Sequence, residues 1–348
     1  AIRRQRQMCI RDRVNTCCFI NDAKEESVNT ILEMAEYKKT GSCKVLVVTG
    51  CMAQRYKNEI IEEVPEVDAV LGTTSYGDIL KAIREAMEGK HFQEFKDIDY
   101  LPEKLGKRVL TTGGHFGYLK IAEGCDKHCT YCIIPKLRGK FRSVPMERLV
   151  TQAKEMAEEG VKELILVAQE TTVYGTDIYG KKSLHILLKE LCKIKGIRWI
   201  RVLYCYPEEI YDELIQTMKE EKKICHYLDL PIQHASDRIL KRMGRRTTQA
   251  ELVEIVNKLR REIPDIVLRT TLISGFPGET QEDHKELMGF VDEMEFDRLG
   301  VFTYSPEEDT PAATMPDQVA EEVKEARRDE IMDCLLYTSP SPRDRSVS

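Results

Sequence analysis

The sequence has no apolar run long enough to cross a membrane, and nothing in it resembles a signal peptide. These absences argue against an integral membrane protein and against a secreted one. Twelve cysteines could indicate a secreted disulfide scaffold, but they are spread through 348 residues with helix and strand patterning. A reducing cytoplasm fits them better, because it keeps thiols reduced.

The two ends of the chain differ from the rest. Residues 1–13 and 334–348 resemble conceptual translations of an adapter used to prepare sequencing libraries. One inverted DNA end can encode both, since a reading of residues 8–12 gives Leu-Tyr-Thr in a shifted frame of its reverse complement. We leave both tails out of the fold prediction, as one would a cloning scar. The alternative is a natural basic arm and a natural disordered tail.

The chain also has no excess of positive charge. Its formal net charge is −6, and the first tail contributes +4 and the second +1, so the remainder carries −11. An acidic body argues against broad, nonspecific nucleic-acid binding. The length and the apolar fraction are those of a globular chain with room for two domains.

Residues 14–89 predict an incomplete α/β domain of the flavodoxin or Rossmann type. Its expected elements alternate along the chain: the end of a strand at 14–20, a helix at 22–39, a strand at 43–51, a helix at 53–63, a strand at 68–71 and a helix at 76–88. This alternation predicts a parallel sheet with helices on its faces. The polar residues 90–114 then predict a linker.

Residues 115–333 predict a second α/β domain with six strands, each followed by a helical pattern. The strands are expected at 117–122, 163–168, 199–204, 227–230, 267–273 and 298–303. The main helices between them are expected at 144–159, 184–193, 208–220, 250–262 and 280–295. Six consecutive units of this kind predict a partial (β/α)6 barrel resembling a TIM barrel, with its chemistry at the carboxyl ends of the strands.

Three cysteines, Cys125, Cys129 and Cys132, follow the first of these strands with three and then two residues between them. Three thiolates can hold three corners of a 4Fe-4S cluster, which leaves the fourth iron open to a substrate. Structural zinc prefers four ligands in pairs, and no second pair lies at a suitable distance. A redox pair would use Cys129 and Cys132 and leave Cys125 unexplained.

Polar and glycine-rich segments follow the next four strands. They are Gln169-Glu170-Thr171-Thr172, Tyr206-Pro207-Glu208, Gln233-His234-Ala235-Ser236 and Gly275-Phe276-Pro277-Gly278-Glu279-Thr280. Their acceptors could hold the amino group and the ribose of a nucleoside cofactor. Glu279 and Thr280 could equally be cap residues of the next helix. For His234, an ordinary hydrogen-bonded loop histidine is favoured over an acid or base.

Two arginines, Arg138 and Arg142, lie just past the cysteine loop. Each could bind a carboxylate of a cofactor or substrate, or pair with an acidic neighbour in the fold. In the first domain, Cys17 and Cys51 both fall at predicted strand ends, where they could share a metal centre. Buried free cysteines are common, so on position alone a core role is at least as plausible for both.

Several segments together resemble the radical S-adenosylmethionine (SAM) methylthiotransferases. They are Asn15-Thr16-Cys17, Val48-Thr49-Gly50-Cys51, the three-cysteine loop, Ile133-Ile134-Pro135, Arg138-Gly139 and Arg142-Ser143. Residues 168–175 and 230–236 resemble the RimO branch of that family, which modifies an aspartate of ribosomal protein S12. The branch that modifies tRNA adenosine typically has Gln-Ser-Gly-Ser where this chain has residues 233–236.

The resemblance implies two 4Fe-4S clusters and SAM as cofactors. Cys125, Cys129 and Cys132 match the ligands of the radical SAM cluster, and Cys17 and Cys51 match the second and third ligands of an N-terminal cluster. The first ligand would belong to an earlier strand, and the family's small C-terminal β domain (TRAM) would follow residue 333; we expect both to be missing here. The N-terminal cluster should then be incomplete, with Cys18 or Cys43 as improvised substitutes only.

The resemblance further implies the reaction. A deoxyadenosyl radical made from SAM would take a hydrogen from the β-carbon of the aspartate, and a methylthio group would replace it to give 3-methylthioaspartate. No catalytic side chain is predicted. The expected partners are ribosomal protein S12 and an electron donor such as flavodoxin or ferredoxin, in the cytoplasm and without a membrane. The alternatives are a tRNA methylthiotransferase on the same scaffold and a noncatalytic iron-sulfur protein.

Overall fold

The computed structural model describes residues 11–102 and 114–338, which divide into two compact units. The first unit is formed by the amino-terminal part of the chain up to Gly106, together with Cys132–Lys140 and Ser305–Asp309. The second unit holds the remainder. Residues 1–10, 103–113 and 339–348 lie outside the described part, and with them most of both predicted tails and part of the predicted linker.

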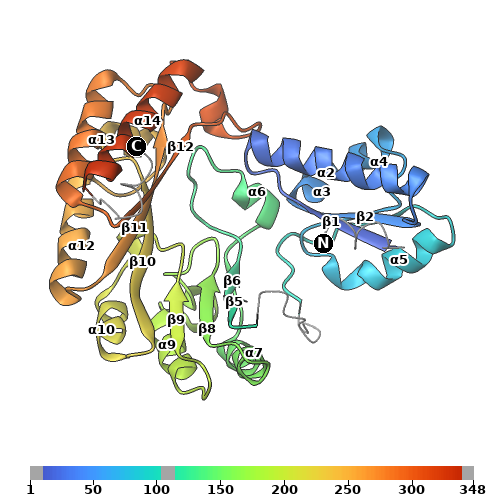
Figure 1. Cartoon of the computed structure of the whole chain (residues 1–348), viewed down its shortest axis with the longest axis horizontal. Coiled ribbons are helices and arrows are strands. Elements are labelled where there is room, and N and C mark those ends of the chain that lie inside the picture. The colour runs from blue at the N-terminus through green and yellow to red at the C-terminus, as the bar shows by residue number, and fades with distance from the viewer. Residues whose placement is uncertain (1–10, 103–113, 339–348) are drawn as a thin grey trace. The chain divides into compact units, whose positions relative to one another are not determined.

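The first unit contains a parallel sheet of four strands in chain order, as the alternating pattern predicted (Figure 1). Its strands are β1 (Arg11–Thr16), β2 (Val45–Gly50), β3 (Ala69–Leu71) and β4 (Phe92–Glu94). Two boundaries differ from the prediction. β1 begins at Arg11, inside the predicted tail 1–13, and β4 lies inside the predicted linker 90–114. A strand of three residues with one buried apolar side chain, Phe92, is too short for a periodic pattern to reveal.

Helices cover both faces of this sheet. On one face Leu46 and Val48 of β2 pack with α2 (Asn21–Thr40), and on the other Val45 and Val47 pack with α5 (Ile79–Met87). This alternation along one fully buried strand produces the helix–sheet–helix layering. The helix expected at 53–63 is divided into α3 (Cys51–Tyr56) and α4 (Glu59–Glu63), because Lys57 takes a positive φ of 42°.

The segment Cys132–Lys140 belongs to the first unit, although the sequence suggested one continuous domain over 115–333. It contains the short helix α6 (Ile134–Arg138). Leu137 of this helix and the preceding residue Ile133 are buried in the core of the first unit. The hydroxyl of Thr73 donates to the carbonyl of Leu137 at 3.0 Å. Hydrophobic packing therefore assigns this segment to the first unit, although it is continuous in the chain with the second.

The second unit contains six parallel strands in chain order, which confirms the predicted partial barrel. They are β5 (Phe116–Lys120), β8 (Glu163–Val167), β9 (Trp199–Val202), β10 (Ile224–Gln233), β11 (Val267–Ser274) and β12 (Arg298–Thr303). The crossover helices lie along one side of the sheet in Figure 1. They are α7 (Met146–Glu158), α9 (Leu184–Cys192), α10 (Asp212–Glu220), α12 (Gln249–Glu262) and α13 (Gln281–Met294).

Shorter elements follow the carboxyl ends of these strands. They are β6 (Ala122–Glu123) with its antiparallel partner β7 (Arg142–Ser143), α8 (Thr176–Tyr179), α11 (Asp237–Arg242) and the 3-10 turns Pro207–Glu209 and Pro311–Thr314. A third 3-10 turn, Tyr76–Asp78, follows β3 in the first unit. A further helix, α14 (Glu321–Thr338), packs against β11, β12 and α13 and extends into the predicted tail 334–348. None of the helices in the described ranges is long and apolar enough to span a bilayer.

Side chains of the six-stranded sheet alternate between two environments. On β8, for example, Leu164 and Leu166 are fully buried, whereas their neighbours are half-buried. Tyr118 of β5 and Phe302 of β12 are exposed. Because all six strands run in parallel, their carboxyl ends meet at one edge, and the loops at this edge form the rim on which a site can be built.

Candidate metal centre

The loop that follows β5 and β6 brings Cys125 and Cys129 to the wall of one cavity of about 410 Å³. Both side chains are largely buried, with 7% and 6% of the residue exposed. The other residues that line the cavity are Asp126, Lys127, His128, Phe141, Glu170, Val173, Thr176, Tyr206, Glu208, Glu209, Gly244, Arg245 and Arg246. The predicted rim segments after the second and third strands therefore meet the cysteine loop.

Neighbouring segments hold the cysteine loop in place. The side-chain carbonyl of Gln169, which follows β8, accepts from the backbone N–H of Gly124 at 2.9 Å. At the other end of the loop, the N–H of Thr130 donates to the carbonyl of Met243 at 2.9 Å, and the Thr130 hydroxyl donates to the carbonyl of Arg242 at 2.8 Å. Each of these bonds satisfies a polar group that the loop would otherwise leave without a partner.

Gly244 allows the segment after α11 to approach the cysteine loop closely. Its φ is +73°, and a Cβ at this position would lie 2.7 Å from the carbonyl oxygen of His128. Any other residue would therefore meet both backbone strain and a clash with the loop that carries Cys129. A glycine just after a helix suggests the positive φ, but the contact with the cysteine loop cannot be seen in the sequence.

Tyr206 links Cys129 to two cations. Its hydroxyl lies 3.5 Å from the Cys129 sulfur, and burial raises the pKa of Tyr206 well above its usual range. The Arg245 guanidinium stacks 4.3 Å from the ring centroid, and the Lys127 ammonium lies 5.1 Å from it. These cation–π contacts hold positive charge beside the cysteines, where thiolates would carry negative charge.

Several buried polar atoms of the cavity residues have no hydrogen-bond partner among the described residues. They are Glu170 Oε2, Glu208 Oε2, Arg245 Nε and Arg245 Nη1. Buried groups of this kind are normally satisfied, so their number at one place indicates a ligand with polar groups of both signs. The two cysteine thiols, the carboxylates of Glu170 and Glu208 and the buried cation of Arg245 fit an iron-sulfur cluster that binds an amino acid–like ligand.

Burial changes the acidity of two groups at this site. It raises the pKa of the Cys125 thiol to about 11, so that binding of a metal cluster would have to displace the proton. It also raises the pKa of the Glu170 carboxyl to about 7, against the opposing effect of hydrogen bonds from the Thr172 hydroxyl and N–H. Glu170 can therefore be neutral or charged near neutral pH.

The strand ends at the rim include two residues in the left-handed region. Tyr204, after β9, has a φ of +60°, and Gln233, at the end of β10, has a φ of +72°. Gln233 follows a register shift in the pairing of β10 with β11. Non-glycine residues with such backbone angles are costly and cluster at functional sites, which agrees with the position of the cavity.

Cys132 begins the segment that belongs to the first unit, whereas Cys125 and Cys129 belong to the second. In the described ranges, no three or more His, Cys, Asp or Glu side chains are arranged to hold a single metal ion. In a cubic cluster each thiolate binds a different iron, so the ligands do not converge on one point. The complete triad stays a prediction, whereas the cavity brings Cys125 and Cys129 together.

In the first unit, Cys17 and Cys51 directly follow two residues that are register partners in the β1–β2 pairing, Thr16 and Gly50. They therefore occupy the same edge of the sheet, as predicted. Cys17 is exposed and Cys51 is half-buried. Gly50 makes this approach possible, because its φ is +104° and a Cβ would lie 2.3 Å from the carbonyl oxygen of Thr16.

The two suggested substitute ligands have different positions. Cys18 is fully buried next to Cys17, and burial together with the charge of Cys51 raises the pKa of its thiol to about 12. Cys43 precedes β2, so it lies at the opposite edge of the sheet from Cys51, about 20 Å away for a strand of this length. Cys43 is therefore excluded as a substitute ligand, which corrects the expectation from the sequence.

Arg138 and Arg142 have separate environments. Arg138, at the end of α6, donates from Nε to the sulfur of Cys51 at 3.2 Å, a contact with a thiol that the sequence did not suggest. Arg142 lies in β7, opposite Glu123 of β6. The segment with Arg138 packs with the first unit, whereas Arg142 belongs to the second, and for both the choice between a bound carboxylate and an acidic neighbour stays a prediction.

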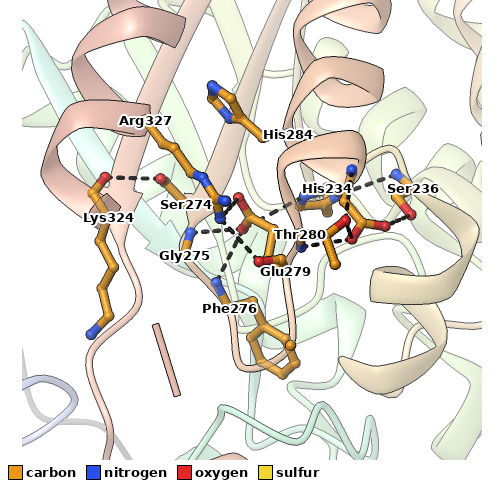
Figure 2. A network of polar contacts seen from close by, with 12 residues as sticks. His234, Ser236, Ser274, Gly275, Phe276, Glu279, Thr280, His284, Lys324 and Arg327 are labelled. Carbon is orange, nitrogen blue, oxygen red and sulfur yellow. Dashed lines mark hydrogen bonds and ion pairs between the residues drawn. The ribbon is translucent and has the colours of Figure 1, made fainter. Parts of the chain in front are cut away.

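Several of the predicted rim residues after β10 and β11 belong to a polar network, in which His234, Ser236 and Glu279 are buried (Figure 2). Thr280 is the N-cap of α13 and forms a capping box with Asp283. Glu279 accepts from the N–H groups of Gly275 and Phe276 at 2.7 and 3.1 Å. His234 accepts from the N–H of Ser236 at 2.9 Å. His234 and Glu279 thus have structural partners, and the cap interpretation of Thr280 is confirmed.

Sequence reasoning missed Lys127, Glu209, Arg245 and Arg246 as cavity residues. Lys127 lies inside the cysteine motif, and Arg245 and Arg246 lie between α11 and α12. The pattern of polar residues directly after strands does not include these arginines, because they follow a helix. Two consecutive arginines after a glycine were the one available signal in the sequence.

Comparison with known protein families supports the interpretation of both units. Residues 119–291 match the Radical SAM superfamily, and residues 12–72 match a family described as "Uncharacterized protein family UPF0004". Among solved structures, the radical SAM methyltransferase TsrM from Kitasatospora setae has a TM-score of 0.63 at 13% identity. That alignment covers 87% of this chain and 62% of TsrM. The fold and the cysteine loop thus define a radical SAM enzyme.

Curated relatives narrow the class further. The chain is 68% identical over 320 residues to the ribosomal protein uS12 methylthiotransferase RimO of Lachnoclostridium phytofermentans, covering 92% of this chain and 73% of the relative. It is 57% identical to the RimO protein of Clostridium perfringens, covering 92% and 72%. The chain belongs to the RimO family of ribosomal protein uS12 methylthiotransferases, which confirms the resemblance seen in the sequence.

Proposed function

We propose that the chain transfers a methylthio group to the β-carbon of an aspartate in ribosomal protein S12, with 3-methylthioaspartate as product. The observation that carries this proposal is the 68% identity to a named uS12 methylthiotransferase over 92% of the chain. The relatives are named for the ribosomal protein, which favours this substrate over a tRNA adenosine. The cysteine cavity favours an enzyme over a noncatalytic iron-sulfur protein.

Cys125, Cys129 and Cys132 would hold a 4Fe-4S cluster that binds SAM, and Cys17 and Cys51 would supply ligands to a second cluster. When bound, these groups supply the electron and the radical that removes a hydrogen from the substrate. The Gln169 side chain and the Met243 carbonyl hold the cysteine loop so that Cys125 and Cys129 face one cavity.

Side chains of the cavity would bind and orient the ligand. Arg245 is buried, stacks on Tyr206 and has two nitrogen atoms without a hydrogen-bond partner, so it can pair with a carboxylate of a bound ligand. Glu170 has one oxygen without a partner and can accept from an ammonium or hydroxyl group.

An electron donor such as flavodoxin or ferredoxin would be needed, and the substrate places the reaction in the cytoplasm. The formal net charge of −6 makes strong binding to free nucleic acid unexpected. To separate the two substrates, S12 and digested tRNA from cells that express the chain would be compared by mass spectrometry. Methylthio-modified tRNA without modified S12 would contradict the proposal.

The test of the cluster site is Cys129→Ala, compared with Cys192→Ala as a control. Cys192 is also buried, but it lies on α9 and does not line the cavity. We expect Cys129→Ala to lose iron from the triad and to abolish formation of 5′-deoxyadenosine from SAM, whereas Cys192→Ala keeps both. Deoxyadenosine production by Cys129→Ala at the parental rate would contradict the assignment of the triad.

A further inference from the structure

A buried ion pair joins α14 to the loop after β11. The guanidinium Nη1 of Arg327 lies 3.0 Å from Glu279 Oε1 and also donates to the Glu279 backbone carbonyl at 3.1 Å. The side chain of Glu279 is fully buried and that of Arg327 is 9% exposed. Figure 2 shows the carboxylate between Arg327, the loop backbone and His234. A charge at this depth depends on its partner.

The second carboxylate oxygen of Glu279 holds the loop. Glu279 Oε2 accepts from the N–H groups of both Gly275 and Phe276. Helix α14 also lies directly on the loop, because a Cβ on Gly275 would be 2.2 Å from the Cγ of Lys324. The hydroxyl of Ser274 donates to the Lys324 carbonyl at 2.9 Å. The start of the loop is therefore shaped by α14 from two sides.

No other cation of the described residues is placed to replace Arg327 as the hydrogen-bonded partner of Glu279. His234 Nε2 is 3.7 Å from Glu279 Oε2 and has no hydrogen-bond partner. Its other nitrogen, Nδ1, accepts from the Ser236 N–H, and burial lowers the pKa of His234 to about 3. His234 is thus neutral, and the negative charge of Glu279 is balanced by Arg327.

The same loop contacts the segment that carries the cysteines. The Phe276 ring is fully buried and meets the Tyr131 ring edge to face, with centroids 6.4 Å apart. Tyr131 is two residues after Cys129 in the chain. Beside it, the carbonyl of Thr130 accepts from the N–H of Ala312 at 2.9 Å. A shift of Phe276 would therefore displace Tyr131 and with it the cysteine loop.

We propose that Arg327 is a positioning residue, which acts through Glu279 and Phe276 to hold the cysteine loop in the geometry that binds the cluster and SAM. This inference rests on the proposed function only where it concerns the binding of SAM. The mechanical coupling from α14 to the loop is independent of it. Helix α14 is thereby part of the site without lining the cavity.

The test uses hydrogen exchange of the iron-free chain, followed by mass spectrometry of peptides. The variants are Arg327→Met, Arg327→Lys and the control Arg328→Met. Arg328 is the next residue of α14, is partly exposed and pairs with Asp329 at 2.8 Å. A double variant, Glu279→Gln with Arg327→Met, removes both charges and keeps a carbonyl oxygen for the loop N–H groups.

We expect Arg327→Met to speed exchange by about tenfold or more in residues 274–280 and in 125–131, because it leaves a buried carboxylate without its partner. Arg327→Lys should show part of the parent's protection against exchange. The control Arg328→Met, which keeps Arg327, should show all of it. The double variant should fold and regain protection in 274–280. If Arg327→Met does not fold, the double variant compared with Glu279→Gln alone gives the same information.

A second measurement separates positioning from stability. In the reconstituted enzyme, Arg327→Met should raise the KM for SAM by about tenfold while changing kcat less, since the loop geometry governs binding. Faster exchange confined to 274–280, or spread evenly over the whole second unit, would overturn the proposal. So would an Arg327→Lys variant without any rescue. If exchange follows the expectation but no variant cleaves SAM, the proposed function fails and the coupling stands.

Discussion

The raised pKa of Glu170 makes a quantitative prediction about stability and pH. Glu170 is 1% exposed, one of its oxygens is bonded to Thr172, and the other has no hydrogen-bond partner. The change Glu170→Gln keeps the size of the side chain and an oxygen for the Thr172 N–H, but it removes the ionisation. The difference between variant and parent therefore isolates the effect of charging this one group.

Burial raises the pKa of Glu170 from 4.5 to about 7 in the folded chain. Between these values the folded state holds a proton that the unfolded state has lost, so the free energy of unfolding falls as the pH rises. The loss is complete above the folded-state pKa and amounts to about 3 kcal/mol, at about 1.4 kcal/mol for each pH unit. The stability of Glu170→Gln relative to the parent should therefore rise by this amount between about pH 4 and pH 8.

Urea unfolding of the iron-free chain at several pH values measures this difference. The chain has a single tryptophan, Trp199, at the start of β9, so its fluorescence follows the second unit. Equal pH dependence of Glu170→Gln and the parent from pH 4.5 to 8 would refute the reasoning.

Glu209 provides a matched control at the same cavity. Partial burial acts to raise the pKa of Glu209, but hydrogen bonds from Lys127 and Lys182 outweigh it and lower the pKa below 4.5. Its charge therefore stabilises the folded chain at neutral pH, and this contribution is lost as the pH falls through the lowered pKa. Glu209→Gln should thus be less stable than the parent at pH 7, opposite in sign to Glu170→Gln.

Two further substitutions test the local geometry of the rim. Gly244→Ala should destabilise the second unit by about 1–3 kcal/mol in urea unfolding and lower the iron bound per chain, because of the positive φ and the close His128 carbonyl. Gly180→Ala, with a φ of +69° and no atom within 4 Å, should cost less, and equal costs would contradict the clash. Thr280→Ala should lower the free energy of unfolding by about 1 kcal/mol through loss of the α13 cap. Thr248→Ala, at the matching capping box of α12, should cost about as much but leave hydrogen exchange in residues 274–280 unchanged.

The secondary structure was largely predictable because it depends on local patterns. The six strands of the second unit were predicted within a few residues, since apolar runs bounded by turn residues carry that information. Elements without such a pattern were missed. The three residues of β4, the break at Lys57 and the short helix α6 each depend on contacts with distant segments or on a single backbone angle.

The positions of the candidate ligands were predictable in part. In a parallel sheet, residues that follow neighbouring strands lie at one edge, which placed Cys17 beside Cys51 and put Cys125 and Cys129 on the rim. The same rule excludes Cys43, which precedes its strand. Cavity residues outside strand ends, such as Arg245, could not be found by this rule.

The amino-acid sequence by itself determined the order of strands and helices, the spacing of the three cysteines and the family to which the chain belongs. These properties are local or are carried by identity, so they need no knowledge of long-range contacts. Tertiary structure alone decided that α6 packs with the first unit, that Glu170 shares a cavity with Cys125, and that α14 holds the loop after β11. Those facts depend on packing between segments far apart in the chain, and no local pattern encodes such packing.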